Sequence, residues 1–100
     1  MTYTVVLSDA AEDDIAEIMA YLLDHAGEKA ARNYVDALID YCQSFATFPE
    51  RGIRSDSNPR LRLVGYRRRA TIVFTVENDR VIIARIFNRG RNVELPEGQL

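Results

Sequence analysis

The chain has 100 residues, of which 47% are hydrophobic and 28% charged, which is the size and composition of one globular domain with a single core and leaves no room for a second. Its net charge of -2 is unevenly divided, because residues 1–50 hold two cations and ten acids (a balance of -8), whereas residues 51–100 hold eleven arginines and five acids (a balance of +6). This division indicates one surface for a polyanion or an acidic partner and another that repels it, unless the two halves simply complement each other within the fold.

The first elements along the chain are a strand and a helix. Residues 3–7 are short, apolar and β-branched, which predicts a strand, and Ser8 or Asp9 can then cap a helix. Asp9 and Glu12 have the spacing of a capping box. Apolar residues follow at helical intervals, at Ala11, Ile15, Ile18 and Leu22. Gly27 is expected to end this helix.

A second helix is predicted by large apolar residues that recur every three or four positions. They are Tyr34, Leu38, Tyr41, Phe45 and Phe48. A stripe of aromatic residues at this spacing is typical of a core face rather than of a ligand-binding site. Pro49 and Gly52 would end the helix. We expect the two helices to form an antiparallel hairpin.

The remainder of the chain reads as β structure. Residues 51–59 have the composition of a loop, and three apolar runs follow at residues 61–64, 71–76 and 81–87. Residues 77–80 are few enough for a hairpin turn between the last two runs. The predicted fold is α+β in one domain spanning residues 1–100: an N-terminal strand, an antiparallel two-helix hairpin and then a three-stranded antiparallel meander.

Strict alternation assigns the strand residues to two faces. It places Ile72, Phe74 and Val76 opposite Thr71, Val73 and Thr75, and Ile82, Ala84 and Ile86 opposite Val81, Ile83, Arg85 and Phe87. One face is expected to cover the helices. The other carries threonines and Arg85, is bordered by Arg67, Arg68 and Arg69, and would stay open unless a partner or the C-terminal tail covers it.

Several classes of protein are excluded by what the sequence lacks. Cys42 is the only cysteine, so no intramolecular disulfide can form, and no Cys/His cluster has the spacing of metal ligands. Residues 1–14 include no basic segment and only a short apolar run, which argues against a signal peptide or a membrane span. We therefore expect a cytoplasmic protein that binds no metal and no cofactor.

A larger pattern of segments extends over nearly the whole chain. Its parts are the helix start at residues 8–10 with its acids, Ile15, Tyr21, FPERG (48–52), LRLVGYRR (61–68), TIVFTV (71–76) and VIIARIFNRGR (81–91). In order and spacing these segments resemble the ParE branch of the RelE/ParE toxin superfamily, although each segment alone is a weak signal. Many relatives have a histidine shortly after the last strand, where this chain has Asn88.

The resemblance implies the toxin of a type II toxin–antitoxin system with a RelE/ParE-like fold. It implies a ParD-like antitoxin that holds the toxin inactive by wrapping an extended C-terminal segment around the helices and sheet. It also implies DNA gyrase as the target, with no membrane partner and no small-molecule cofactor.

Candidate binding residues come from the basic half of the chain. The predicted target-binding group consists of Arg67, Arg68, Arg69, Arg85, Arg89 and Arg91. Arginines of this kind can contact phosphates or an acidic protein groove, although a run of charge is commonly a solvated face. The acid pair Asp13 and Glu17 and the lone His25 are interpreted as solvated helix residues, so no catalytic residue is assigned.

Three functions remain open at this stage. The first is a toxin that inhibits gyrase by binding, the second a RelE-like ribosome-dependent mRNA endonuclease, and the third a nontoxic remnant that binds only an antitoxin. The endonuclease is disfavoured because that branch generally places an arginine on the middle strand of the meander, where this chain has Thr71, and a tyrosine or histidine just beyond the last strand. Only Arg91 matches a catalytic arginine there, and Glu94 or Glu97 is left as a substitute base.

Overall fold

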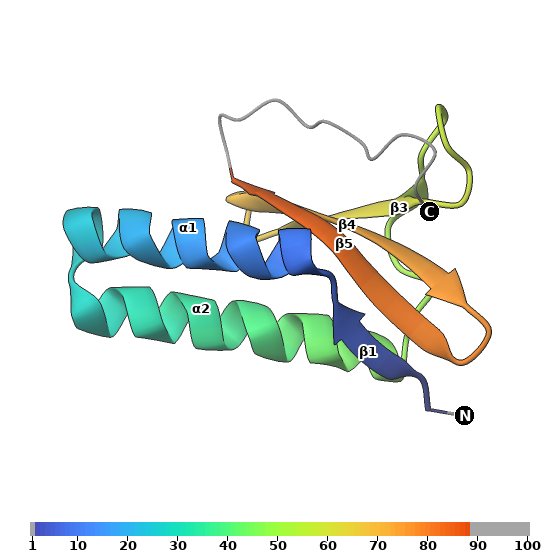
Figure 1. The fold of residues 1–100 in the computed structure, drawn as a ribbon, viewed down its shortest axis with the longest axis horizontal. Helices are drawn as coiled ribbons and strands as arrows, with labels where there is room; N and C mark the ends of the chain where they lie inside the picture. The colour runs from blue at the N-terminus through green and yellow to red at the C-terminus, as the bar shows by residue number, and fades with distance from the viewer. Residues whose placement is uncertain (1, 89–100) are drawn as a thin grey trace.

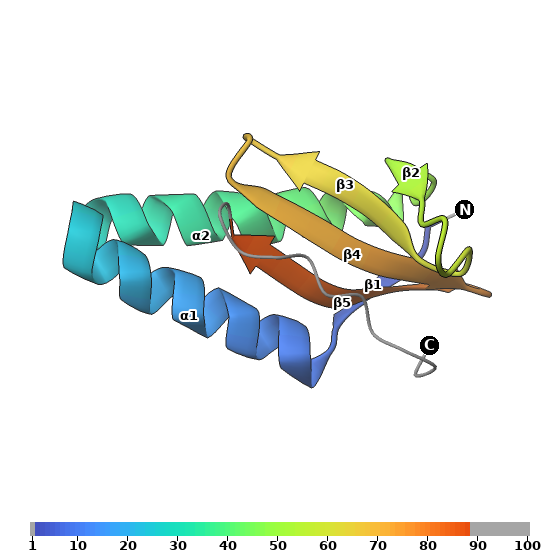
Figure 2. The ribbon, with the colours of Figure 1, turned by 90° about the horizontal axis from the view of Figure 1, so that it is seen from above.

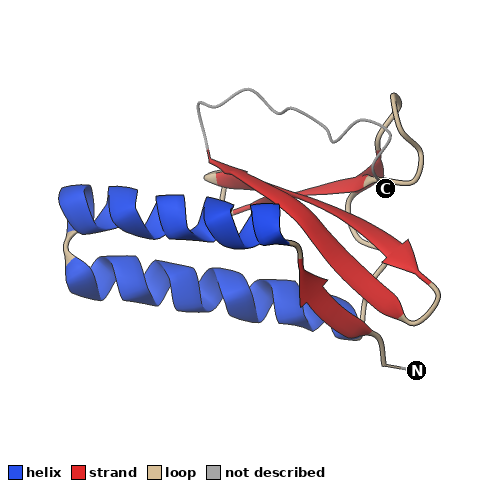
Figure 3. Cartoon of the chain, viewed as in Figure 1, coloured by secondary structure: helices blue, strands red, loops and turns tan. Residues whose placement is uncertain are grey.

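Two helices and five strands make up the computed structural model, which describes residues 2–88 (Figure 1). In chain order they are β1 (Thr4–Leu7), α1 (Asp9–Ala26), α2 (Glu28–Gln43), a 3-10 turn η1 (Ser44–Ala46), β2 (Ile53–Arg54), β3 (Arg62–Tyr66), β4 (Ala70–Glu77) and β5 (Arg80–Asn88). The helices form one layer and the strands the other (Figure 3). The predicted α+β class, helical hairpin and antiparallel meander are confirmed.

The helical hairpin begins and turns at the residues that the sequence indicates. Ser8 is the N-cap of α1, because its Oγ accepts a hydrogen bond from the amide of Ala11 at 3.0 Å. Gly27 ends α1 and precedes α2 with a φ of 89°. This backbone conformation is unfavourable for residues that have a Cβ. The helices lie side by side, and their closed end extends past the sheet (Figures 1 and 2). Neither helix is long and apolar enough to cross a membrane.

The predicted extent of the second helix is wrong at its C-terminal end. The α-helix ends at Gln43 and continues as the 3-10 turn, in which the Ser44 hydroxyl donates back to the Tyr41 carbonyl. This tighter turn breaks the 3.6-residue period on which the aromatic stripe was extrapolated. Phe45 is therefore buried in the core, whereas Phe48 is 66% exposed.

The five strands form one mixed sheet in the order β1-β5-β4-β3-β2. β1 pairs in parallel with β5, and the other neighbours are antiparallel. The strand β2 lies in the segment predicted to be loop. It is reached through Gly52, at φ 68°, where an added Cβ would overlap the carbonyl oxygen of Leu63. Gly52 thus lets the backbone after α2 approach β3 closely enough to add a strand.

A β-bulge changes which residues of β5 face the helices. Val73 pairs with Arg85, but the next residue of β4, Phe74, pairs with Ile83, which leaves Ala84 as the extra residue. Ile83 therefore joins the helix-facing core with Ile86. The strict alternation predicted for β5 is wrong on this side of the bulge, whereas the assignment of β4 is consistent with the core.

Buried residues form a main core between the layers and a smaller cluster elsewhere. The main core joins α1, α2 and the sheet through residues such as Ile18, Leu38 and Phe74. The smaller cluster consists of Leu61, Val73 and Phe87, all at most 3% exposed, with Leu63 packed against it. Because Val73 and Phe87 belong to the face predicted to be open, the centre of that face is a second apolar core rather than a free surface.

Candidate functional site

The turn between β3 and β4 displays three consecutive arginines, which we call the arginine turn: Arg67, Arg68 and Arg69. It is closed by a hydrogen bond of 2.9 Å from the amide of Arg69 to the carbonyl of Tyr66. All three side chains are exposed, whereas Tyr66 and Ala70 on either side are buried. The sheet thus presents three guanidinium groups at one end of its central hairpin.

The backbone of the arginine turn is strained. Arg67 and Arg68 have φ values of 50° and 58°, as in the type I′ turns that connect strands tightly. Asn-Gly is the favoured pair for this conformation, since a residue with a Cβ is held there at a cost of roughly 1–2 kcal/mol. Two arginines are therefore kept where local propensity favours other residues.

Aromatic side chains of α2 hold the base of the turn. The ring of Tyr66 lies 5.0 Å from that of Tyr41 and 5.9 Å from that of Tyr34, and the Arg67 guanidinium lies 5.1 Å from the centre of the Tyr66 ring. Burial raises the pKa of Tyr34, Tyr66 raises it further, and Arg69 and Arg67 act in the opposite direction. The positive field of the turn therefore reaches the hydroxyl of Tyr34, which has no hydrogen-bond partner among the described residues.

Most of the other described arginines are engaged by carboxylates or by the backbone. Within residues 2–88, the arginines found in ion pairs are Arg32, Arg60, Arg80 and Arg85. The arginine turn takes part in none of these pairs. Its three charges are consequently available to a partner without first breaking an internal salt bridge.

Arg85 is held within the fold by Asp14 of α1. Its Nε and Nη2 donate to the two carboxylate oxygens at 2.8 and 3.0 Å, and Asp14 also accepts from the backbone amide of Ile86 at 2.8 Å. The Asp14 side chain is 5% exposed and that of Arg85 27%. The structure therefore corrects the predicted placement of Arg85 on an open sheet face, because its guanidinium is paired with Asp14 of the helix. Its role in target binding stays a prediction.

Asp14 occupies this place because β1 is shorter than β5. β1 ends at Leu7, opposite Ile83, so the edge of β5 beyond that point lacks a strand partner. Ser8 donates from its hydroxyl to the carbonyl of Ala84, and Asp14 accepts from Ile86. Two side chains at the start of α1 thus replace the missing strand. The sequence contained a signal for this role, since Asp14 lies three residues after Ala11 and four before Ile18, on the apolar face.

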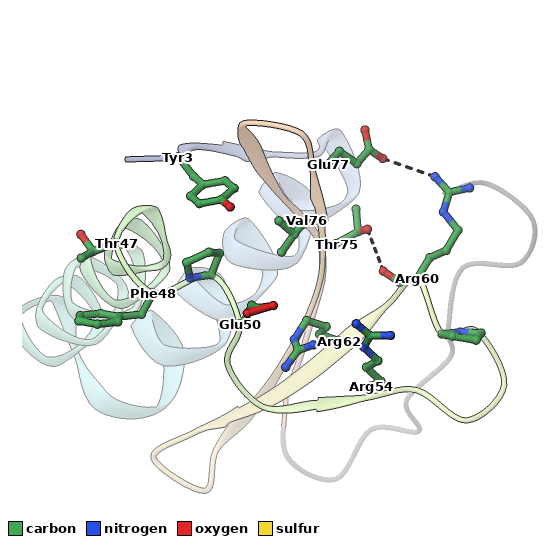
Figure 4. Close-up of a pocket in the computed structure, with 12 residues that line it drawn as sticks. Tyr3, Thr47, Phe48, Glu50, Arg54, Arg60, Arg62, Thr75, Val76 and Glu77 are labelled. Atoms are coloured by element: carbon green, nitrogen blue, oxygen red, sulfur yellow. Dashed lines mark hydrogen bonds and ion pairs between the residues drawn. The ribbon is translucent and has the colours of Figure 1, made fainter. Parts of the chain in front are cut away.

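A pocket of about 720 Å³ lies between the segment after α2 and the strands (Figure 4). Its lining combines apolar and charged residues: Tyr3, Thr47, Phe48, Pro49, Glu50, Arg54, Pro59, Arg60, Arg62, Thr75, Val76 and Glu77. Arg62 donates to the carbonyl of Arg51 at 2.9 Å, and Arg60 lies 3.8 Å from Glu77. Sequence analysis missed this pocket because it depends on β2, and the FPERG segment was its only local signal.

The predicted target-binding group is therefore only partly assembled. The structure brings Arg67, Arg68 and Arg69 together at an exposed turn and binds Arg85 to Asp14. Arg89 and Arg91 lie outside the described residues. No group of three His, Cys, Asp or Glu side chains within residues 2–88 could hold a metal ion.

A comparison with protein families matches most of the chain. The model described as the ParE toxin of the type II toxin–antitoxin system parDE matches residues 5–93. The chain belongs to the ParE toxin family. The sequence resemblance to the ParE branch is thereby confirmed, and with it the class of a type II toxin. Among curated proteins, none matches the sequence.

Solved structures share the fold of this ParE-family chain. A structure described as the chromosomal ParDE TA system from P. aeruginosa superposes with a TM-score of 0.76 and 17% identity, covering 87% of this chain and 96% of that one. A conserved hypothetical protein from Helicobacter pylori, solved in solution, gives a TM-score of 0.53 and 15% identity, with coverages of 89% and 96%. At these identities the likeness concerns the fold alone.

Proposed function

We propose that this ParE-family toxin inhibits DNA gyrase by binding it in the cytoplasm, and that a ParD-like antitoxin neutralises it. The observation that carries the proposal is the family match over residues 5–93. The arginine turn supports it as the target-facing group, because it is exposed and forms no ion pair with the described residues. Arg89 and Arg91 belong to the same proposed group.

The alternative of an mRNA endonuclease is disfavoured by the residues near the arginine turn. Thr71 and Asn88 stand where RelE-type nucleases carry catalytic groups, and the pairing of Ala70 with Asn88 brings both beside the turn. Neither side chain exchanges a proton near neutral pH. A site that held only cations would therefore lack the rate enhancement of roughly 10² to 10⁴-fold that general acid–base catalysis supplies.

We therefore expect the purified protein to inhibit gyrase supercoiling and to leave translated mRNA uncut. A supercoiling assay measures the first, and primer extension on mRNA after induction measures the second. In cells, the gyrase lesion should appear as double-strand breaks with an SOS response. Codon-specific cuts at the ribosomal A site with unaffected gyrase would instead establish the endonuclease. Absence of both lesions would favour a nontoxic remnant that still binds an antitoxin.

The antitoxin is proposed to use the exposed apolar side chains and the pocket. Exposed large apolar residues of the described part of the chain occur on β1, α1 and β2 and in the segment after α2: Val6, Tyr21, Leu23, Phe48 and Ile53. A helix of the antitoxin would rest on the helical hairpin, and an extended segment would follow the sheet edge. Acids of that segment would pair with pocket arginines such as Arg54.

A partner segment that folds on this surface should bury roughly 1,000–3,000 Å² and show a negative heat-capacity change. We expect a ribbon-helix-helix antitoxin to be encoded directly upstream, and isothermal calorimetry with that protein to give tight binding with this signature. Phe48→Ala, which removes an exposed ring at the pocket, should weaken binding by about ten-fold or more.

Leu23→Ala is the comparison, since it removes a similarly exposed apolar side chain from α1. If Leu23→Ala weakened antitoxin binding and Phe48→Ala did not, the extended segment of the antitoxin would not bind at the pocket. Micromolar affinity, or binding without a heat-capacity change, would contradict coupled folding altogether.

A further inference from the structure

The arginine turn combines two unfavourable features that a solvent-exposed loop does not need. Arg67 and Arg68 occupy the left-handed region at φ 50° and 58°, which disfavours residues with a Cβ. Three adjacent guanidinium groups also repel one another, and the described residues provide no carboxylate that pairs with them. A strained outlier that persists at an exposed charged site is a reason to look for a ligand.

We infer that the arginine turn binds the phosphates of a nucleic-acid backbone. A guanidinium is planar, always charged and able to donate two parallel hydrogen bonds to phosphate oxygens. Three of them on successive residues can engage neighbouring phosphates without contacting bases. The inference goes beyond the proposed function, since it adds a contact with nucleic acid to the gyrase contact that is proposed for the same turn.

The surroundings of the turn suit contact with a phosphate backbone. Protein interfaces depend on apolar and aromatic anchors that become buried at their centre. Within residues 2–88, the exposed large apolar residues lie on β1, α1 and β2 and in the segment after α2. The ring nearest the turn, Tyr66, is only 6% exposed, with the Arg67 guanidinium beside it. Charge without an apolar anchor suits a phosphate backbone.

The charge distribution leaves an approach to the turn open. α1 holds six acids and neither Lys nor Arg between Asp9 and Ala26, so this helix repels a polyanion. β3 and its turn lie on the opposite flank of the molecule from α1 (Figure 2). A nucleic acid can thus contact the turn while α1 faces away.

The test is fluorescence anisotropy of a labelled duplex titrated with the purified toxin at about 50 mM salt and upward, with a single strand of the same length in parallel. Three phosphate contacts predict that log K falls with log salt with a slope of about -2.7. Arg67→Asn with Arg68→Gly keeps the turn geometry but removes two cations. We expect it to weaken binding by about ten-fold or more and to reduce the slope by about 2.

The matched control is Arg32→Ser with Arg80→Ser, which changes the net charge equally. Arg32 is paired with Glu28 on α2, and Arg80 with Glu77 at the far end of β4. The affinity of the control variant for nucleic acid should stay within about two-fold of the wild-type affinity, because its two substitutions lie away from the proposed phosphate contacts. Circular dichroism checks that each variant is folded.

Three results would overturn the inference: no binding of either nucleic acid by the wild type, equal loss in the control, or full binding by the turn variant. A turn variant that lost contact with gyrase but kept nucleic-acid binding would make the turn a protein contact instead. Supercoiling assays keep the two proposals separate. Gyrase inhibition without nucleic-acid binding would overturn the inference and leave the proposed function in place. Nucleic-acid binding without gyrase inhibition would support the inference and overturn the proposed function.

Discussion

Replacing Arg67 with Asn and Arg68 with Gly is expected to make the protein more stable and less toxic. Both positions have positive φ, so the Asn-Gly pair should relieve strain of about 1–2 kcal/mol in the folded state. For a domain of this size, a thermal unfolding scan should show a melting temperature raised by roughly 4–8 °C per kcal/mol. The stability gain and the functional loss would come from the same two side chains.

The loss of toxicity follows from the same substitution. A hydrogen bond to a charged group contributes about 1.5–3 kcal/mol, so each lost contact should weaken target binding by about ten-fold or more. Growth inhibition after induction measures this effect, at protein levels matched by immunoblot. The substitution of Arg32 and Arg80 by Ser is the control. Unchanged toxicity in the turn variant would move the target-binding surface to the pocket or the helical hairpin.

Removing the carboxylate of Asp14 is expected to produce the largest loss of stability. Asp14→Ala leaves the Arg85 guanidinium and the Ile86 amide without the oxygens that accept from them at 2.8 to 3.0 Å. Breaking one partner of a buried pair costs about 3–5 kcal/mol, a large part of the roughly 5–15 kcal/mol that stabilises a typical domain. Chemical denaturation monitored by circular dichroism measures the difference.

Asp13→Ala is the matched control, since Asp13 is the exposed neighbour on the same helix turn. We expect it to change the free energy of unfolding by no more than about 0.5 kcal/mol. The double variant Asp14→Ala with Arg85→Leu should recover part of the loss, because a guanidinium is then no longer kept at this site without the Asp14 carboxylate. Equal effects at Asp13 and Asp14 would show that only helix charge matters.

Local sequence determined the two helices, the residues that begin and separate them, and the succession of β1, β3, β4 and β5 along the chain. Ser8 and Gly27 act within one turn of the chain, so their roles can be predicted from neighbours alone. The run of three arginines between two apolar segments likewise indicated a basic border of the sheet, which the structure shows to be a turn. The charge balances of -8 and +6 for the two halves of the chain likewise indicated an acidic and a basic surface.

The tertiary structure decided everything that depends on pairing between distant segments. The bulge at Ala84 arises from the register between β4 and β5, and it shifts Ile83 to the core face. Asp14 and Arg85 are 71 residues apart and meet because β1 ends before β5 does. Periodicity describes each segment against an idealised neighbour, whereas register, strand length and helix ends are fixed only when the segments pack. The sequence therefore showed that arginines are concentrated in residues 51–100. Only the fold determined which of them pair with carboxylates.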